Sequence, residues 1–181
     1  MNGGIHQNEV IAIKEVDLEK LEDKYLQNLN VNLFLNEKNE IVIMMSLNHP
    51  NILKTYSTCY NNHKIYLVMQ FMNQGSLQNI LSYKYANGIK DISIIATIML
   101  ECVKAIQYLH KNNIIHRDLK AANILMNENG HICLGDLGVA GLLQQSKRRF
   151  SFVGSLAWMA PEIFSSGEGY DCKVINLMLN I

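Results

Sequence analysis

The stretch IIHRDLKAANIL, residues 114–125, places charged and amide side chains between two apolar pairs. Ile114 and Ile115 lead into the polar run, and Ile124 and Leu125 lead out of it, so both ends are expected to be buried. The polar side chains between them are His116, Arg117, Asp118, Lys120 and Asn123. A segment that is fixed at both ends holds its polar middle in one geometry, which is what catalysis requires.

These polar residues carry a recognisable set of chemical abilities. Asp118 can accept a proton, Lys120 can stabilise negative charge on a transferred group, and the carbonyl oxygen of Asn123 is a good ligand for Mg²⁺. A second acid, Asp136, follows in GDLG, residues 135–138, and its flanking glycines are expected to bend the backbone and bring that carboxylate to the same metal. Two acids, a cation and an amide around one point favour phosphoryl transfer, which depends on positioning and charge stabilisation.

The overall composition indicates an ordinary globular protein. A length of 181 residues suits one domain, and 49% hydrophobic with 18% charged residues excludes a disordered chain. Lys+Arg and Asp+Glu are both 16, so no basic field indicates a nucleic-acid partner and no acidic tail is present.

Cysteine spacing and the first residues indicate a cytoplasmic location. Cys59, Cys102, Cys133 and Cys172 form no CxxC pair, which argues against zinc, and the apolar content argues against a disulfide framework, so we expect mostly buried, reduced thiols. The start MNGGIHQNEV lacks the features of a signal peptide, and Asn2 excludes the myristoylation signature. No stretch is expected to reach the apolar length of a membrane span, so membrane insertion is not predicted.

Periodicity predicts strands early in the chain and a long helix later. The expected strands are residues 9–16, 51–60 and 63–72, the last two joined by a turn at NNH, with a helix at 32–47 after an Asn-rich insertion. A helix is expected at 92–113, stopping at an Asn pair, followed by two short strands around NENGH, residues 127–131. A short helix is expected to begin at APEIF, with Pro161 in its first turn. The order predicts an α+β fold with a small β-rich lobe, a helical lobe and a cleft between them.

HRDLKAAN, GDLG, IAIK and APE, in these relative positions, resemble the signature set of eukaryotic protein kinases. The resemblance implies the protein-kinase-like two-lobe fold, with ATP and Mg²⁺ as cofactors. It makes Asp118 the catalytic base, places Lys120 on the γ-phosphate, and gives Mg²⁺ to Asn123 and Asp136. His116 is expected to bond backbone near the metal-binding Asp136.

The same resemblance implies a nucleotide site. Lys14 would reach the α- and β-phosphates and pair with a glutamate on the following helix, which is Glu40 by family spacing, with Glu37 as the alternative. The adenine would bond the hinge and lie between two apolar side chains. These positions are the hinge residues Gln70, Phe71 and Met72, the gatekeeper Met69, and Ala12 and Leu125 on the two sides of the purine.

Further likeness concerns substrate class and regulation. Lys120, two places after Asp118, resembles serine/threonine rather than tyrosine kinases, and FVGSLAWMAPE places Ser155 where such kinases carry Thr or Ser. Together with YLHKNNIIHRDLKAANIL, this resembles the STE20-like group, nearest the oxidative-stress-responsive and proline/alanine-rich kinases. The implied partners are protein substrates with Ser or Thr and an upstream activating kinase. Phosphate on Ser151 would pair with Arg117.

Three departures from the family pattern qualify this interpretation. DLG stands where DFG is usual, no Gly-rich loop precedes IAIK, and VINLMLNI follows GYDCK where a central helix would start. We therefore expect a partial kinase domain, 1–72 a remnant of the small lobe with the hinge and 73–181 part of the large lobe. A truncated gene model, a degenerate copy and a splice product all remain open, and a non-catalytic binding module is the alternative function.

The missing central helix leads to an expectation about the long helix and about activity. Its apolar face, containing Ile95, Ile98, Met99, Val103 and Ile106, is expected to stay partly in water. Each such side chain would forgo about 1.5 to 3 kcal/mol of burial, so we expect marginal folding and impaired activity of the chain as written.

Overall fold

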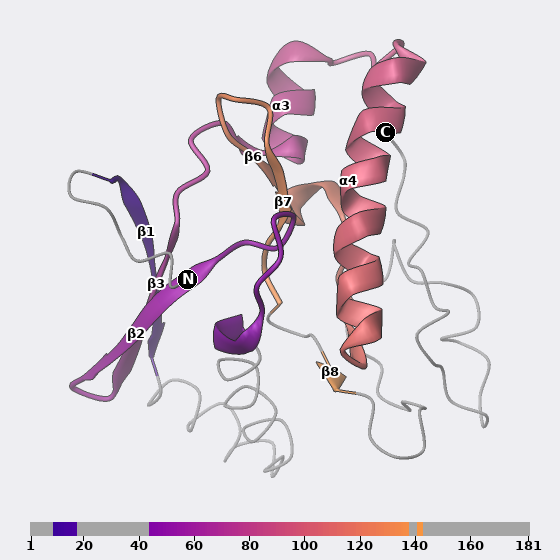
Figure 1. Ribbon diagram of the computed structural model, residues 1–181. Coiled ribbons are helices and arrows are strands. Elements are labelled where there is room, and N and C mark those ends of the chain that lie inside the picture. Colours follow the sequence, from indigo (N-terminus) through magenta and orange to yellow (C-terminus); the bar gives the residue numbers. More distant parts are fainter. Residues whose placement is uncertain (1–8, 18–43, 138–140, 143–181) are drawn as a thin grey trace, which may run out of the picture. The chain divides into compact units, whose positions relative to one another are not determined.

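The computed structural model describes residues 9–17, 44–137 and 141–142 (Figure 1). The chain divides into two compact units after Met72, with residues 49–52 grouped with the second unit. Of the helix expected at 32–47, residues 44–46 are described and are helical. The short helix expected at APEIF lies outside the described residues.

The described residues of the first unit contain a three-stranded antiparallel sheet in the order β1-β3-β2. Its strands are β1 (Ile11–Asp17), β2 (Thr55–Asn61) and β3 (Lys64–Gln70), and their paths can be followed in Figure 1. The β2–β3 turn has Asn62 at φ 46° and His63 at φ 59°, a left-handed pair that matches the twist of a two-residue hairpin. The predictions of β1 and of a hairpin around NNH are confirmed.

The strand expected at 51–60 begins later than predicted. The structure starts β2 at Thr55, and Ile52 instead forms a parallel bridge with Leu134 of the second unit. The backbone N–H of Leu134 donates to the carbonyl of Asn51 at 2.8 Å. The apolar pattern of a segment indicates an extended backbone but not the strand with which that backbone pairs. The prediction therefore joined residues 51–54 to the following strand, whereas Ile52 pairs about eighty residues away.

The long helix of the second unit is α4 (Ile92–Lys111). Asp91 caps its start, because its carboxylate accepts from the backbone N–H of Ser93 at 2.8 Å. At the other end the chain turns through Asn113 at φ 57°, whose N–H donates to the carbonyl of His110 at 3.0 Å. The prediction of a helix that stops at the Asn pair is confirmed.

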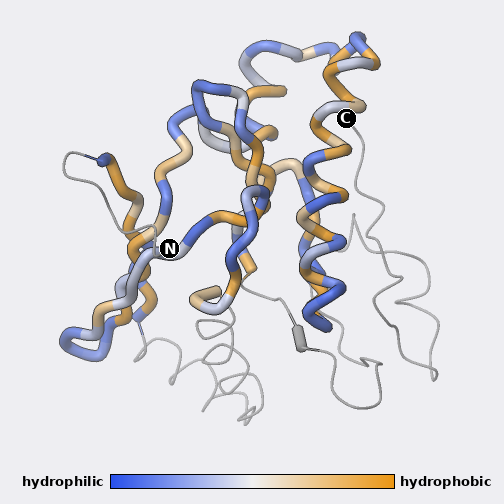
Figure 2. Tube along the Cα trace, in the orientation of Figure 1, coloured by the Kyte–Doolittle hydropathy of each residue, from blue (hydrophilic) through white to orange (hydrophobic). Residues whose placement is uncertain are grey.

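The expectation that the apolar face of α4 stays partly in water is confirmed for four of its five residues and is wrong for Ile98. The buried residues are Ile98, Cys102, Ala105 and Leu109, one helical stripe, and α4 packs against the strands β7 and β5. Ile98 was expected to stay partly in water and is only 3% exposed, whereas Val103 is 51% exposed and Ile95, Met99 and Ile106 are half-buried. Figure 2 shows polar and apolar residues mixed along α4. Because α4 carries apolar residues on several of its sides, its sequence pattern alone did not show which side is buried.

Within the described residues, α4 is also long and apolar enough to cross a membrane by length and composition. The expectation that no stretch reaches that length is therefore wrong. The criterion is a weak indication, since the core helix of a soluble protein meets it as well.

The second unit contains one helix that the sequence did not predict, α3 (Leu77–Lys84). Its eight residues are too few for a stable isolated helix, and its polar and apolar residues are only weakly separated onto opposite faces. Tertiary context supplies the missing stability: Ser76 caps its start by accepting from the N–H of Asn79 at 3.2 Å, and Leu77 is fully buried.

The remaining elements of the second unit flank the polar stretch of residues 114–125. β4 (Gly75–Ser76), β6 (Ile124–Met126) and β7 (Ile132–Leu134) form one antiparallel sheet, and β5 (Ile114–Ile115) pairs with β8 (Gly141–Leu142). The hairpin predicted around NENGH is confirmed. The side chain of Asn127 accepts from the N–H groups of Asn129 and His131, and Gly130 takes a φ of 75°.

Candidate active site

The polar stretch is held at both ends as predicted. Ile114 and Ile115 form β5 and are buried, and Ile124, also buried, opens β6 after the short 3-10 helix η1 (Ala121–Asn123). Leu125, which was expected to be buried as well, is half-buried. The apolar anchors therefore fix the eight-residue connection 116–123 between two strands that belong to different sheets.

Asp118 lies between two donors from its own loop. The amide nitrogen of Asn123 donates to the Asp118 backbone carbonyl at 2.7 Å and to its carboxylate Oδ2 at 3.0 Å. The ammonium of Lys120 is 2.7 Å from the same Oδ2. The Asp118 side chain is 11% exposed and that of Lys120 is 26% exposed, so the carboxylate is oriented while the cation still reaches solvent. The structure thus brings together Asp118, Lys120 and Asn123.

His116 fixes the position of the backbone that precedes Asp136. Its Nε2 lies 3.1 Å from the carbonyl oxygen of Gly135, and its Nδ1 accepts from the backbone N–H of Asp118 at 3.3 Å. A carbonyl can only accept and a backbone N–H can only donate, so the ring is neutral with its proton on Nε2. Burial lowers the pKa of His116, which favours that neutral form. The contact expected for His116 is confirmed.

The bend at Asp136 is made differently from the prediction. Asp136 itself takes φ 50°, and Gly135 is not among the described glycines with positive φ, whereas Gly138 lies outside the described residues. Gly135 instead joins two parts of the loop, since its N–H donates to the carbonyl of Asn123 at 2.8 Å and its carbonyl accepts from His116. The Asp136 side chain is exposed. A left-handed non-glycine residue is strained, and such strain occurs often at functional sites.

Arg117 shares this unusual conformation. Its φ is 67°, and the residue is only 8% exposed despite its charge. A guanidinium can remain buried only where its donors are satisfied. Ser151 and Ser155, the residues expected to carry regulation with Arg117, lie outside the described residues, so the pairing of Arg117 with a phosphate stays a prediction.

The residues expected around the nucleotide are divided between the units. In the first unit Ala12 pairs with Met69 and Lys14 with Leu67 across the β1–β3 ladder, which places these side chains on one face of the sheet. Leu125 belongs to the second unit. Glu40 and Glu37, the alternatives for the partner of Lys14, lie outside the described residues.

The expected hinge lies at the boundary between the units. Met72 is buried, Phe71 is 47% exposed and Gln70 is half-buried. The N–H of Gln70 donates to the carbonyl of Lys54 at 2.9 Å. The chain thus leaves β3 at Gln70 and enters the second unit at Asn73, as a connecting segment would.

The donor groups near Asp118 fit a hard divalent cation. The amide nitrogen of Asn123 makes both of its hydrogen bonds to Asp118, so the side-chain oxygen is the atom of this residue that could bind a cation. Oxygen donors of this kind suit Mg²⁺, which commonly takes one or two protein ligands together with phosphate oxygens and water. Among the described residues no group of three or more His, Cys, Asp or Glu could hold a metal, and a magnesium site of this composition does not need one.

One part of the site was not predicted from the sequence. The segment HPNI, residues 49–52, pairs with β7, the strand that leads into Gly135 and Asp136. The sequence signal for this segment is Asn51 in a turn before the apolar pair Ile52 and Leu53, and this pattern by itself is typical of any loop.

Comparison with known proteins is consistent with this geometry. Residues 3–175 match the family described as the protein kinase domain. The chain is 35% identical over 165 residues to serine/threonine-protein kinase fray1 of Dictyostelium discoideum, covering 90% of the chain and 27% of the relative. It is 36% identical over 182 residues to germinal center kinase 3 of Caenorhabditis elegans, covering 92% of the chain and 29% of the relative. It is 37% identical over 156 residues to the PAK kinase mbt of Drosophila melanogaster, covering 86% of the chain and 22% of the relative.

The chain therefore belongs to the protein kinase family, and its relatives are serine/threonine kinases of the STE20 type. The sequence identities to these relatives are nearly equal. They therefore support the STE20 type and do not assign the chain to one branch within it. The chain spans less than a third of the length of these relatives.

Proposed function

We propose that this chain carries the phosphoryl-transfer site of a serine/threonine protein kinase, which moves the γ-phosphoryl group of ATP to a Ser or Thr hydroxyl of a protein. The carrying observation is the Asp118 carboxylate, held by Asn123 at 3.0 Å and Lys120 at 2.7 Å in a buried loop. Such a fixed base suits a reaction in which positioning contributes most of the rate.

Asp118 is the proposed base for the substrate hydroxyl. Its carboxylate is proposed to accept the hydroxyl proton, and its Oδ2 is held by the donors of Asn123 and Lys120. These contacts hold the carboxylate plane in one orientation. The 11% exposure of the side chain gives a hydroxyl access while most water is excluded.

Lys120 is proposed to contact both Asp118 and a phosphate oxygen of the nucleotide. In the structure its ammonium contacts Asp118, and its 26% exposure lets it also meet a phosphate oxygen. An ammonium between a base and a phosphoryl group lowers the energy of the negative charge that develops during transfer.

Asn123 and Asp136 are the proposed ligands of Mg²⁺, which supplies charge neutralisation on the phosphates when bound. Gly135 connects these ligands, because its N–H is bonded to Asn123 and its residue is followed directly by Asp136. Lys14, from the first unit, is proposed to contact the α- and β-phosphates, with Ala12, Met69 and Leu125 around the purine.

The test is a transfer assay on a Ser/Thr peptide with Mg²⁺-ATP. Asp136→Ala should abolish transfer, and Asp118→Asn should reduce it by orders of magnitude while ATP binding persists. Glu128→Gln is a matched control, since Glu128 is an exposed acid in the β6–β7 turn. Near-parental turnover in either site variant would contradict the roles. Nucleotide binding without transfer in the parent chain would instead favour the non-catalytic module.

Regulation by phosphate is a further part of the proposal. Phosphate on Ser151 would add nearly two negative charges, and Arg117 is proposed to pair with it through charge-assisted hydrogen bonds. An upstream kinase would supply that phosphate. Equal transfer rates for a phosphorylated parent and its Ser151→Ala variant would remove Ser151 as the switch.

A further inference from the structure

Strand β7 is held along both of its edges, although only one edge is paired with another strand of its sheet. On one side it pairs with β6 in the antiparallel ladder. On the other side the segment His49–Ile52 runs beside it, with the Leu134 N–H donating to the Asn51 carbonyl at 2.8 Å and Ile52 bridging to Leu134. The thiol of Cys133 donates to the carbonyl of Pro50 at 3.3 Å. A strand held in this way has little freedom to shift sideways.

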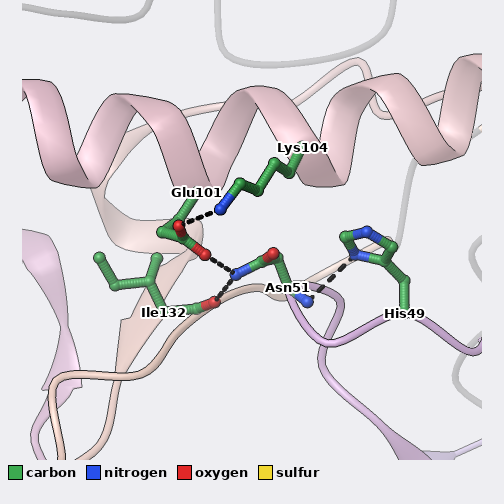
Figure 3. A network of polar contacts seen from close by, with 5 residues as sticks. All are labelled: His49, Asn51, Glu101, Lys104 and Ile132. Atoms are coloured by element: carbon green, nitrogen blue, oxygen red, sulfur yellow. Dashed lines mark hydrogen bonds and ion pairs between the residues drawn. The ribbon is translucent and has the colours of Figure 1, made fainter.

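The Asn51 side chain joins this segment to the helix behind it. Its amide nitrogen donates to the carbonyl of Ile132 at 2.9 Å and to the Glu101 carboxylate Oε2 at 2.7 Å, as Figure 3 shows. Asn51 is 2% exposed. An amide nitrogen has two protons, and each has one of these acceptors. One side chain thus connects the 49–52 segment, β7 and α4.

The position of the Asn51 side chain is itself fixed by its neighbours. The Asn51 backbone N–H donates to Nδ1 of His49 at 3.1 Å, and the His49 ring stacks on Tyr108 of α4 with centroids 4.8 Å apart. Glu101 is held on its other oxygen by the ammonium of Lys104 at 2.6 Å. The carboxylate therefore presents Oε2 to Asn51 in a defined direction.

β7 leads directly to the proposed metal ligand. Leu134 ends the strand, Gly135 follows with both backbone groups bonded to the catalytic loop, and Asp136 comes next in the left-handed region. A sideways shift of β7 would have to move Gly135 or break its bonds to Asn123 and His116. The placement of Asp136 is therefore mechanically connected to the placement of Ile132 and Leu134.

We propose that Asn51 is a positioning residue for Asp136, acting through β7, and that Glu101 is the residue that orients Asn51. This inference rests on the proposed function only for the role of Asp136 as a magnesium ligand. Residues that support metal ligands from behind change metal affinity by about 10- to 100-fold when they are removed, and the same range is expected here.

The first measurement is hydrogen exchange of the backbone amides of residues 132–137 in the 181-residue chain. Asn51→Ala should raise exchange at Leu134, Gly135 and Leu137 while the amides of α3 keep parental rates. Gln107→Ala is the matched control, because it removes an exposed amide side chain from the same helix α4 and lies outside the Asn51–Glu101–Lys104 network, and it should leave these amides unchanged. A uniform rise across the second unit, or no rise at residues 134–137, would overturn the positioning role.

The second measurement exchanges donor and acceptor. Asn51→Asp removes both N–H donors and places a carboxylate beside Glu101, so it should raise exchange at least as much as Asn51→Ala. Adding Glu101→Gln restores one hydrogen bond, with the amide now on the helix, and should recover part of the protection. Failure of the double variant to recover any protection would show that the Asn51–Glu101 contact does not orient the strand.

The third measurement is a Mg²⁺ titration of nucleotide binding, with a fluorescent ATP analogue as the probe. Asn51→Ala should raise the half-saturating Mg²⁺ concentration about 10- to 100-fold and leave metal-free nucleotide binding close to parental. An unchanged Mg²⁺ requirement would overturn the inference. Absence of nucleotide binding in the parent chain would instead contradict the proposed function, and the exchange measurements would still decide whether Asn51 positions residues 134–137.

Discussion

Replacing Asn123 with alanine removes two hydrogen bonds from the buried catalytic loop. One joins its amide to the Asp118 carbonyl at 2.7 Å and the other joins it to the Asp118 carboxylate at 3.0 Å. A neutral hydrogen bond contributes about 1 kcal/mol and one to a charged group about 1.5 to 3 kcal/mol, so Asn123→Ala should lower the free energy of unfolding by about 2 to 4 kcal/mol. That is a large share of the roughly 5 to 15 kcal/mol of a typical domain.

Urea denaturation followed by intrinsic fluorescence measures this change. The midpoint should fall while the slope stays parental, because the variant alters stability and not the surface exposed on unfolding. Asn123→Ala keeps the backbone carbonyl that accepts from Gly135, so the fold of the loop is retained. Asn129→Ala, in the exposed β6–β7 turn, is the control and should change the midpoint little. A loss below about 0.5 kcal/mol for Asn123→Ala, which is the range of ordinary surface substitutions, would refute the reasoning.

Three further predictions follow from buried or shielded groups. The hydroxyl of Thr55 is buried without a partner among the described residues, so Thr55→Val should raise the melting temperature by about 2 to 4 °C, whereas Thr97→Val, which loses a bond to the Ser93 carbonyl, should not. Burial raises the pKa of the Cys102 and Cys133 thiols to about 11, so iodoacetamide at pH 8 should label exposed Cys59 well before either, as peptide mass spectrometry would show; equal labelling would contradict this. Burial lowers the pKa of His49 below its ordinary 6.5, outweighing the opposing field of Glu101, so the unfolded chain takes up that proton first and stability should fall as pH drops below about 6.5. His49→Gln should reduce that slope in denaturation midpoints measured between pH 7.5 and 5.5, and an unchanged slope would exclude His49 as its source.

Local patterns predicted the elements whose causes are local. The Asn pair that ends α4, the Asn62–His63 turn and the Asn127–Gly130 hairpin each follow from residues that accept left-handed backbone or cap a chain end. The polar loop was predicted for a similar reason, since apolar anchors on both sides of charged residues have few other structural explanations. The roles assigned to its side chains remain predictions that the proposed experiments test.

Contacts between distant residues were not predictable in the same way. The buried face of α4 depends on which strands lie behind it, and a helix with apolar residues on several sides does not encode that choice. α3 depends on a cap and one buried leucine rather than on its own propensity. The backbone bend in GDLG was assigned to the glycines because glycine adopts a positive φ most easily. In the structure Asp136 has the positive φ, and the preceding Gly135 is held by hydrogen bonds of both its N–H and its carbonyl.

The membership of residues 49–52 in the second unit has a consequence for dividing the protein into parts. The polypeptide passes between the units at 48/49, at 52/53 and again at 72/73, so neither unit is one continuous stretch of sequence. A polypeptide that starts at residue 73 would leave one edge of β7 unpaired, with the N–H of Leu134 and the carbonyl of Ile132 deprived of their partners. An exposed strand edge of this kind invites pairing with other chains. Separate production of the second unit therefore calls for grafting His49–Ile52 back onto it, or for a circular permutation that keeps this tetrapeptide joined to β7.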